Sequence, residues 1–428
     1  MIKKIFYGWW IVLACSLIGF YVGGVIFYGF TAFFEPIREE FGWSYTQISF
    51  AASLRGLEMG IFAPLVGFLV DRFGSRKLIF WGTITVGLGL ILLSRTQSLA
   101  MFYGSFLLIA FGAGGCAMVV TMTVVANWFH KHVGIALGVM ASGVGASGLM
   151  VLLIVQLIGI SDWRTTLIIL GLGMWILGIP LSFVIRNRPE QYGYLPDGIS
   201  PSDRMPNLEN QDTGVKAVEM SFKEALKKRA FLYLIIVEAI RMMIVAAVVI
   251  HVMPYLSSLG LPRVTAGLVA GAIPLSSIVG RFFFGWLGDV FDKRYVMAWA
   301  FCIISLGMLA FCYVQVIWIA FVFLLLFSPG YGGGIVLRGA ILREYFGRNS
   351  FGKMIGITMG SASIGGIIGP TAAGWAFDTF ESYRLIWLVF CGLSGLAIYL
   401  VLKMKRCSFE TSMLLLPEEH YRPRRIIP

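Results

Sequence analysis

The sequence predicts an all-α membrane protein with twelve transmembrane helices in two pseudo-symmetric six-helix bundles. Its composition is one reason: 58% of the 428 residues are hydrophobic and 13% are charged, whereas a soluble domain carries roughly a quarter charged residues. A repeated charged hairpin is the other. Residues 67–77 read GFLVDRFGSRK and residues 285–294 read GWLGDVFDKR, so that a glycine, a leucine and an aspartate recur 218 positions later. A repeat at half-chain distance predicts a duplicated helical bundle.

Long apolar runs place the individual helices. A helix needs ~20 apolar residues to cross the ~30 Å hydrocarbon core of a bilayer. The first predicted span starts within the first ten residues, and we interpret it as a retained helix and not as a signal peptide. The twelve predicted spans are 9–34, 46–70, 78–95, 99–127, 133–159, 165–186, 230–257, 264–288, 295–313, 316–337, 351–376 and 384–403.

The placement of basic residues predicts the orientation, because cytoplasmic loops carry an excess of Lys and Arg. With a cytoplasmic N-terminus, few basic residues fall outside, namely Arg38, Arg95, Arg164, Arg263 and Arg384. Three lie within spans, namely Arg55, Arg241 and Arg281. Both termini are therefore expected in the cytoplasm. The protein itself is expected in the cell (inner) membrane of a bacterium or similar cell. The net charge of +12 then reflects topology, and it predicts no nucleic-acid partner.

Four segments are expected. Residues 1–186 form the N-terminal six-helix bundle and residues 229–404 the C-terminal one. Residues 187–228 are polar and contain several prolines, so they are expected to be a cytoplasmic linker. Residues 405–428 are expected to be a cytoplasmic tail. The chain is expected to be surrounded by the lipid bilayer. It is also predicted to be a monomer.

Enzymatic and metal-dependent functions have no support in the sequence. The six cysteines are scattered and form no Cys-x-x-Cys pair, which argues against a zinc site or a disulfide framework. His130 and His132 form the closest histidine pair, but they lie at a charged hairpin, where a solvated loop is the simpler interpretation. No nucleophile triad or phosphate-binding loop is found. We therefore expect a protein that is not an enzyme and has no metal and no cofactor.

The twelve spans, the central loop and the doubled Gly-x-x-x-Asp hairpin resemble the major facilitator superfamily. The resemblance covers nearly the whole chain and implies a secondary transporter. In that family the aspartate of the hairpin caps a neighbouring helix and pairs with arginine across the cytoplasmic gate. Carried over, the resemblance implies that Asp71, Arg72 and Arg76 latch the outward-facing state, with Asp289 doing so in the other half.

A narrower resemblance concerns the substrate. Glu-Phe-Gly-Trp-Ser at 40–44, Asn-Trp-Phe at 127–129, the Arg-Pro-Glu segment at 188–198 and Gly280-Arg281 resemble the bacterial oxalate/formate antiporter and monocarboxylate transporter branch. In these relatives an arginine at this point of span 8 holds the substrate carboxylate. The resemblance implies transport of a small organic anion, a monocarboxylate first, with proton symport as the leading coupling and carboxylate exchange as the alternative.

Arg281 is the leading substrate-binding candidate from the residues themselves. It lies eight positions before Asp289, so ~12 Å from the end of its helix and near the middle of the membrane. An arginine there is costly unless it faces a cavity or a partner, and its guanidinium matches a carboxylate with two hydrogen bonds. Ser277 lies one turn earlier, so no acid on that face of span 8 neutralises Arg281.

Two embedded pairs have opposite charges three residues apart, which puts both partners on one helix face. The pairs are Arg55–Glu58 and Glu238–Arg241. A structural ion pair is the simpler interpretation, and the role of Arg55–Glu58 stays open. Glu238 is the first candidate for proton coupling, and Glu58 and His251 are further candidates. Arg241 is a substrate-binding candidate, because protonation of Glu238 would leave it as a second cation.

Three polar side chains complete the predicted substrate site. Aligning residues 31–34 with the animal monocarboxylate transporters places Tyr28 where those proteins carry a lysine. Ser277 falls where they carry an aspartate, so their proton-coupling chemistry does not transfer to this chain. Tyr331 is expected to line the cavity in a glycine-rich part of span 10. Span 11 has no cation at mid-depth, and one fixed cation suits a monoanion better than a dianion.

Two other function classes remain as alternatives. A drug/proton antiporter of this superfamily carries a Gly-Pro motif in span 5, whereas the motif here, Gly369-Pro370, lies in span 11. A non-transporting membrane sensor would be favoured by a large soluble domain, and the sequence predicts none.

Overall fold

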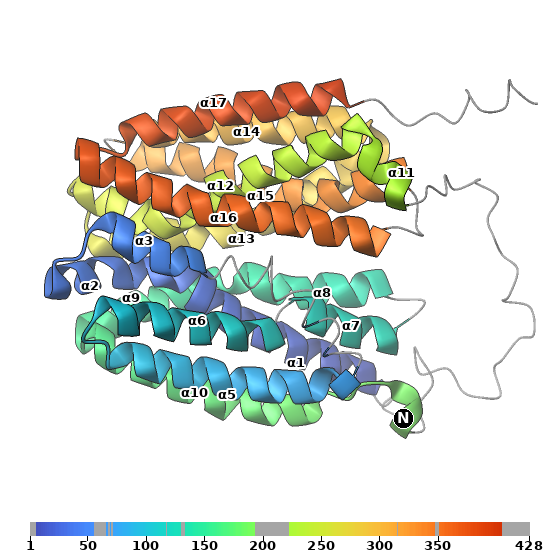
Figure 1. Ribbon diagram of the computed structural model, residues 1–428, viewed down its shortest axis with the longest axis horizontal. Helices are drawn as coiled ribbons and strands as arrows, with labels where there is room; N and C mark the ends of the chain where they lie inside the picture. Colours follow the sequence, from blue (N-terminus) through green and yellow to red (C-terminus); the bar gives the residue numbers. More distant parts are fainter. Residues whose placement is uncertain are drawn as a thin grey trace, which may run out of the picture.

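The protein is described here from a computed structural model, over residues 6–54, 66, 69, 72–116, 118–129, 133–192, 222–314, 316–346 and 351–404. All regular structure in these residues is helical. Among the described residues, ten helical segments are long and apolar enough to cross a membrane, so the chain is a multi-pass membrane protein. Figure 1 shows two layers of helices, with α1–α10 in one and α12–α17 in the other.

The N-terminal half is a set of helices interrupted at glycines. Its elements are α1 (Tyr7–Val22), η1 (Gly23–Tyr28), η2 (Gly29–Phe33), α2 (Phe34–Phe41), α3 (Tyr45–Leu54), α5 (Ser75–Ser94), α6 (Leu99–Gly115), α7 (Met118–Trp128), α8 (Val133–Ala146), α9 (Gly148–Ile160), α10 (Trp163–Val184) and η4 (Pro189–Tyr192). Three predicted single spans are therefore broken. The first passes through a π-helical turn (η1) and a 3₁₀ turn (η2), and the fourth and fifth each divide into two α-helices.

The C-terminal half has longer uninterrupted helices. Its elements are α11 (Phe222–Lys227), α12 (Arg229–Ser258), α13 (Arg263–Val290), α14 (Lys293–Cys312), α15 (Ile317–Phe346), α16 (Phe351–Phe380) and α17 (Arg384–Lys403). The predicted bounds are close for most of them, but α15 runs well past the predicted end at 337. The second predicted span begins as α3 and then leaves the described residues.

The two halves are joined at one end of the bundle. We call this the distal end and the opposite end, where α10 stops and α11 starts, the linker end (Figure 1). At the distal end, the Asp378 carboxylate on α16 accepts hydrogen bonds from the backbone N–H groups of Tyr45 and Thr46, at 2.9 and 2.8 Å, and so caps α3 from the other half. A carboxylate at a helix N-terminus satisfies free N–H groups and favours the helix dipole.

Close backbone approach also joins the halves, through α9 and α13. A Cβ atom added to Gly148 would collide with the carbonyl oxygen of Gly271, and one added to Gly271 would lie 2.6 Å from the carbonyl oxygen of Gly148. Small residues let transmembrane helices pack at this separation. Away from these contacts, side chains of both halves line the space between them.

At the distal end, polar contacts within the N-terminal half hold the start of α10. Asp162 caps α10 and accepts a 2.7 Å hydrogen bond from the N–H of Thr165, and this bond holds the pKa of Asp162 below its usual range. Glu40 pairs with Arg164 at 2.5 Å. Residues 193–221 of the predicted linker (187–228) and the whole predicted tail, residues 405–428, lie outside the described residues.

Candidate anion-binding site between the two halves

A cavity of about 310 Å³ lies between the halves. Both halves line it, and most of its surface is apolar. From the N-terminal half it includes Tyr28, Cys15, Cys116 and Thr121, and from the C-terminal half Arg241, Arg281, Tyr331, Arg338 and Ser363. An apolar cavity with a few convergent charged groups is the usual form of a small-molecule site.

Arg281, the leading substrate-binding candidate, lines this cavity from α13. Its Nη1 donates a 3.3 Å hydrogen bond to the carbonyl oxygen of Ala141 on α8, in the other half. Its Nε is buried and has no hydrogen-bond partner among the described residues. The guanidinium therefore has donor capacity to spare, which suits it to an anionic ligand.

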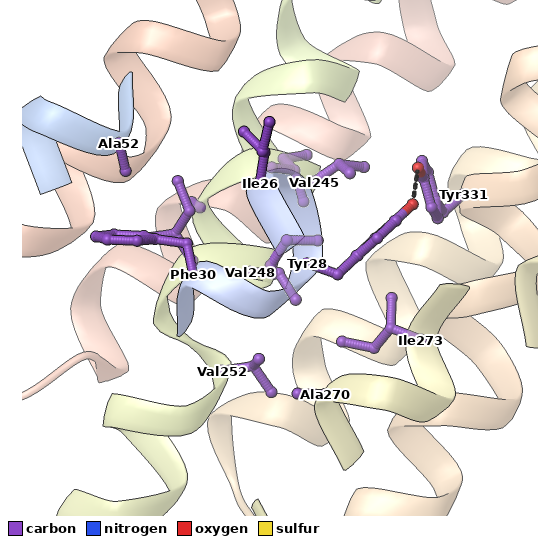
Figure 2. Packing of buried hydrophobic residues seen from close by; sticks show 14 of the residues in the cluster. Ile26, Tyr28, Phe30, Ala52, Val245, Val248, Val252, Ala270, Ile273 and Tyr331 are labelled. Carbon is purple, nitrogen blue, oxygen red and sulfur yellow. Dashed lines mark hydrogen bonds between the residues drawn. The ribbon is translucent and has the colours of Figure 1, made fainter. Parts of the chain in front are cut away.

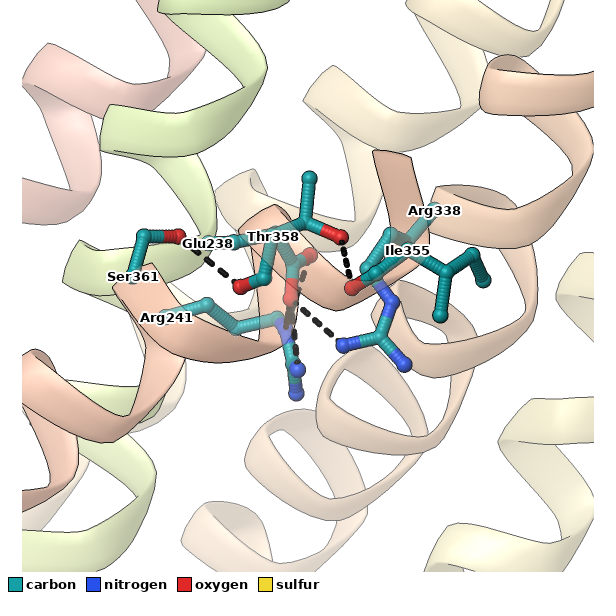
Figure 3. A network of polar contacts seen from close by, with 6 residues as sticks. All are labelled: Glu238, Arg241, Arg338, Ile355, Thr358 and Ser361. Carbon is teal, nitrogen blue, oxygen red and sulfur yellow. Dashed lines mark hydrogen bonds and ion pairs between the residues drawn. The ribbon is translucent and has the colours of Figure 1, made fainter. Parts of the chain in front are cut away.

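Glu238 lies between two arginines (Figure 3). It is fully buried on α12. Arg241, one turn later on the same helix, donates to it from Nη2 at 2.8 Å and from Nε at 3.2 Å. Arg338 on α15 donates to the same carboxylate oxygen, Oε2, from Nη1 at 3.2 Å. The sequence-based pair Glu238–Arg241 is present, but it is part of a three-residue cluster with an excess positive charge.

Arg338 is a charged residue of the cavity wall that the sequence did not point to. It follows directly after the predicted end of span 10 at 337, where an arginine is expected to mark a cytoplasmic loop. The structure places it inside α15, 9% exposed and on the cavity wall. Its Nε is buried without a partner among the described residues. The sequence carries no local signal for this position, because Arg338 directly follows an apolar run and resembles a loop residue.

Tyr28 and Tyr331 meet across the cavity (Figure 2). Their hydroxyl oxygens are 2.9 Å apart, which joins η1 of the N-terminal half to α15 of the C-terminal half. Both residues are buried and both line the cavity. The structure thus brings these two predicted residues together with Arg281 and Arg241.

Ser277 does not reach the cavity. It is fully buried, its hydroxyl donates a 2.6 Å hydrogen bond to the carbonyl oxygen of Pro274, and it is absent from the cavity wall. Gly332 explains the burial, because α15 packs directly on the backbone of Ser277 there. A direct role for the Ser277 side chain in substrate binding therefore has no geometric support.

His251 also lies away from the cavity, near the distal end. Its Nε2 is 2.9 Å from both the Pro370 carbonyl oxygen and the Ser49 hydroxyl, and its Nδ1 is 2.9 Å from the Tyr383 hydroxyl. A carbonyl can only accept, so Nε2 carries a proton and donates to Pro370. The ring is thereby fixed in a fully buried interhelical contact.

The predicted gate is only partly described. Arg72 is exposed, and Arg76 donates from its backbone N–H to Asn187 and places its guanidinium over Phe183. Asp289 is exposed at the end of α13. Within the described ranges, no ion pair links these three side chains to the opposite half.

Several predicted residues lie outside the described residues, namely Arg55, Glu58, Asp71, His130 and His132. In the part of the chain that is described, no group of three His, Cys, Asp or Glu side chains could hold a metal ion.

Known proteins similar to this chain are transporters. An MFS-type transporter of unassigned function, YcxA of Bacillus subtilis, is 24% identical over 86% of this chain and 88% of its own length. Monocarboxylate transporter 12 of Xenopus laevis is 25% identical over 91% of this chain and 88% of its own length. Monocarboxylate transporter 13 of Bos taurus is 23% identical, covering 90% of this chain and 86% of its own.

Solved structures share the fold. A bacterial homologue of the human lysosomal transporter Spinster, in an inward-facing and occupied conformation, has a TM-score of 0.70 at 16% identity and covers 93% of this chain and 94% of its own. The nucleoside transporter NupG has a TM-score of 0.73 at 12% identity and covers 92% of this chain and 99% of its own. The family model of the Major Facilitator Superfamily matches residues 9–279 and 242–420. This chain therefore belongs to the Major Facilitator Superfamily of membrane transporters, and its work is transport and not catalysis.

Proposed function

We propose that this protein carries a small organic anion, a monocarboxylate in the first instance, across the cell (inner) membrane by alternating access. The observation that carries the proposal is Arg281. It lies on the wall of a cavity between the halves, and its buried Nε has no partner among the described residues. A guanidinium in this state binds a carboxylate with two charge-assisted hydrogen bonds.

The proposed domain division follows from the same arrangement. Residues 1–186 and 229–404 are the two rocking bundles, residues 187–228 connect them, and residues 405–428 are a tail. Both termini lie on the cytoplasmic side, so the distal end faces outward. The described conformation, joined at the distal end by Asp378, is then the inward-facing one.

Proton symport is the leading mode of coupling, with Glu238 as the proton carrier. Arg241 and Arg338 both donate to its carboxylate. An anion that binds these arginines competes with Glu238 for their N–H groups. A Glu238 carboxylate that has lost these bonds in a buried position favours taking up a proton, so anion and proton would enter together. Glu58 and His251 are secondary candidates.

Anion exchange is the alternative, and one observation favours it. The cavity wall carries more arginines than acids among the described residues, and an uncompensated buried cation is costly. A carrier of this kind converts between its inward- and outward-facing conformations more readily with an anion bound than when empty. The exit of one anion is therefore coupled to the entry of another.

The names of relatives support the anion class. Transporters named for monocarboxylates align over about nine-tenths of this chain. Their identity of 25% or less leaves substrate length and coupling to be measured.

The test is uptake of radiolabelled lactate, pyruvate, formate and oxalate into proteoliposomes, with and without an inward proton gradient. Wild type is compared with Arg281→Ala and with Arg343→Ala, a matched control for an exposed arginine on α15. Gradient-stimulated uptake that is lost in Arg281→Ala and kept in Arg343→Ala supports symport. Uptake only with an internal counter-anion supports exchange. No uptake of any of the four by folded protein rejects the monocarboxylate assignment and restores the drug-antiporter and sensor alternatives.

A further inference from the structure

The cavity contains two arginines with unused hydrogen-bonding capacity. Arg281 and Arg338 both line it, and the Nε of each is buried without a partner among the described residues. Arg281 donates one hydrogen bond, to a backbone carbonyl oxygen. Arg338 donates one hydrogen bond, to Glu238. The Glu238 carboxylate already accepts three hydrogen bonds from Arg241.

Glu238 cannot balance both of its arginine partners. One carboxylate carries one negative charge, so the cluster of Glu238, Arg241 and Arg338 keeps a net charge of about +1 in a site that is 91% to 100% buried. Arg241 holds the carboxylate from two nitrogens, the closer at 2.8 Å, and Arg338 holds it by one bond of 3.2 Å. Arg338 is thus the weaker partner, and it is the guanidinium that needs a second anion.

The side chain of Arg241 packs closely against the backbone of α15. Gly334 lies against its side chain, and a Cβ atom there would be 2.8 Å from the Arg241 Cδ. This close packing limits the movement of the Arg241 side chain, so Arg338 is the group that a ligand engages first.

Arg338 and Arg281 lie at different depths along the cavity. The α15 position beside the Arg281 backbone is Gly332, where an added Cβ would be 3.2 Å from the Arg281 nitrogen. Arg338 follows Gly332 by six residues, which is ~9 Å along a helix axis. Two guanidinium groups on backbones separated in this way can hold two acidic groups separated along one ligand.

We propose that Arg338 is a second anion-binding residue and that the cavity prefers a short organic dianion with an acidic group at each end of its chain. Arg281 binds one acidic group and Arg338 binds the other. The inference rests on the proposed function only for the role of Arg281. It replaces the expectation of a monoanion, which followed from the missing cation in span 11 and did not include Arg338.

The experiment compares two ligands of equal chain length, succinate and butyrate, which differ by one carboxylate. Binding to the purified full chain in detergent is measured by calorimetry. Wild type is expected to bind succinate at least about tenfold tighter than butyrate, because one charge-assisted hydrogen bond contributes about 1.4 kcal/mol or more, the equivalent of tenfold. Oxalate, whose carboxylates are adjacent, is expected to bind less tightly than succinate.

Substitutions assign the preference to Arg338. Arg338→Gln is expected to reduce the ratio of butyrate to succinate dissociation constants by about tenfold, and Arg338→Lys to keep part of the preference. Arg343→Gln, an exposed residue on the same helix, should leave the ratio unchanged. Circular dichroism and size-exclusion chromatography check that each variant is folded.

The outcomes separate this inference from the proposed function. If wild type binds succinate no tighter than butyrate, or if Arg338→Gln leaves the ratio unchanged, the role of Arg338 is rejected. The proposed function survives that result as long as butyrate binding is lost in Arg281→Gln. If neither ligand depends on Arg281, the proposed function itself fails.

Discussion

At the scale of single residues, Glu238 is the acid on which two buried arginines depend. It is fully buried and accepts hydrogen bonds from Arg241 and Arg338. Removing its charge leaves both guanidinium groups without a counter-charge in a low-dielectric site, and the cost of such a change exceeds that of losing a surface ion pair.

Glu238→Gln is therefore expected to destabilise the protein by about 3 kcal/mol. Glu344→Gln, which removes the partly exposed pair with Lys293, is expected to cost about 1 kcal/mol or less. Thermal unfolding in detergent compares the two variants. Equal losses of stability would contradict a charge-balancing role for Glu238. Added succinate should restore stability to Glu238→Gln more than to Glu344→Gln.

The contrast between Arg281 and Arg338 shows what can be read at this scale from sequence. Arg281 could be predicted because it interrupts an apolar run far from either end. Arg338 could not be, because it stands at the end of an apolar run and resembles a loop residue. Only the continuation of α15 to Phe346 brings it into the cavity.

At the scale of helices, the pair α9 and α13 is a contact that only glycine permits. A Cβ atom at Gly148 would collide with the Gly271 carbonyl. Gly148→Ala is expected to force these helices apart and to lower transport several-fold. Gly138→Ala on α8, where a Cβ meets nothing within 4 Å, is the control. Uptake rates in proteoliposomes with matched protein content distinguish them, and equal rates would refute the packing argument.

The cap that Asp378 places on α3 predicts a change in conformation. Asp378→Asn weakens charge-assisted bonds to Tyr45 and Thr46, worth about 1–2 kcal/mol, and so favours opening of the distal end. Spin labels at Ser161→Cys and Glu381→Cys, in a background without native cysteines, report the opening. The population at longer distance should rise about tenfold.

Asp162→Asn is the matched control for this measurement. Asp162 caps α10 from within its own half, so its loss should lower stability without lengthening the label distance. A distance change of the same size in both variants would show that the Asp378 cap has no special role between the halves.

Most helices could be predicted because their apolar runs have the length that a membrane demands. The breaks within them could not be. Residues 9–34 form one apolar run, but η1 changes its winding, and contacts such as Tyr28 with Tyr331 from the other half depend on that change. The cap by Asp378 joins positions more than 330 residues apart, and no local pattern predicts it.

At the scale of the whole molecule, the two ends of the bundle are expected to close in alternation. The described conformation is joined at the distal end, and Arg72, Arg76 and Asp289 form no ion pair between the halves among the described residues. The repeated hairpin of the sequence is expected to join the linker end in the opposite state.

Asp289→Asn should therefore shift the same spin-label distance in the direction opposite to Asp378→Asn, toward shorter values. The reason is that it weakens only the state in which the linker end is closed. A double variant should return toward the wild-type distribution if the two ends act on one equilibrium. Lengthening in Asp289→Asn would contradict this balance.

The π-helical turn in the first transmembrane segment determines which way the side chains that follow it in that segment point. Each residue of an α-helix turns by about 100°, and a π turn takes up one extra residue before the next turn begins. Tyr28 faces Tyr331, while Thr31 donates to the Ile250 carbonyl. If the same residues wound as an ordinary α-helix, the segment beyond the turn would rotate by about 100° and present a different side to the opposite half. A change in winding alone, with no change in sequence, would then take Tyr28 off the cavity wall.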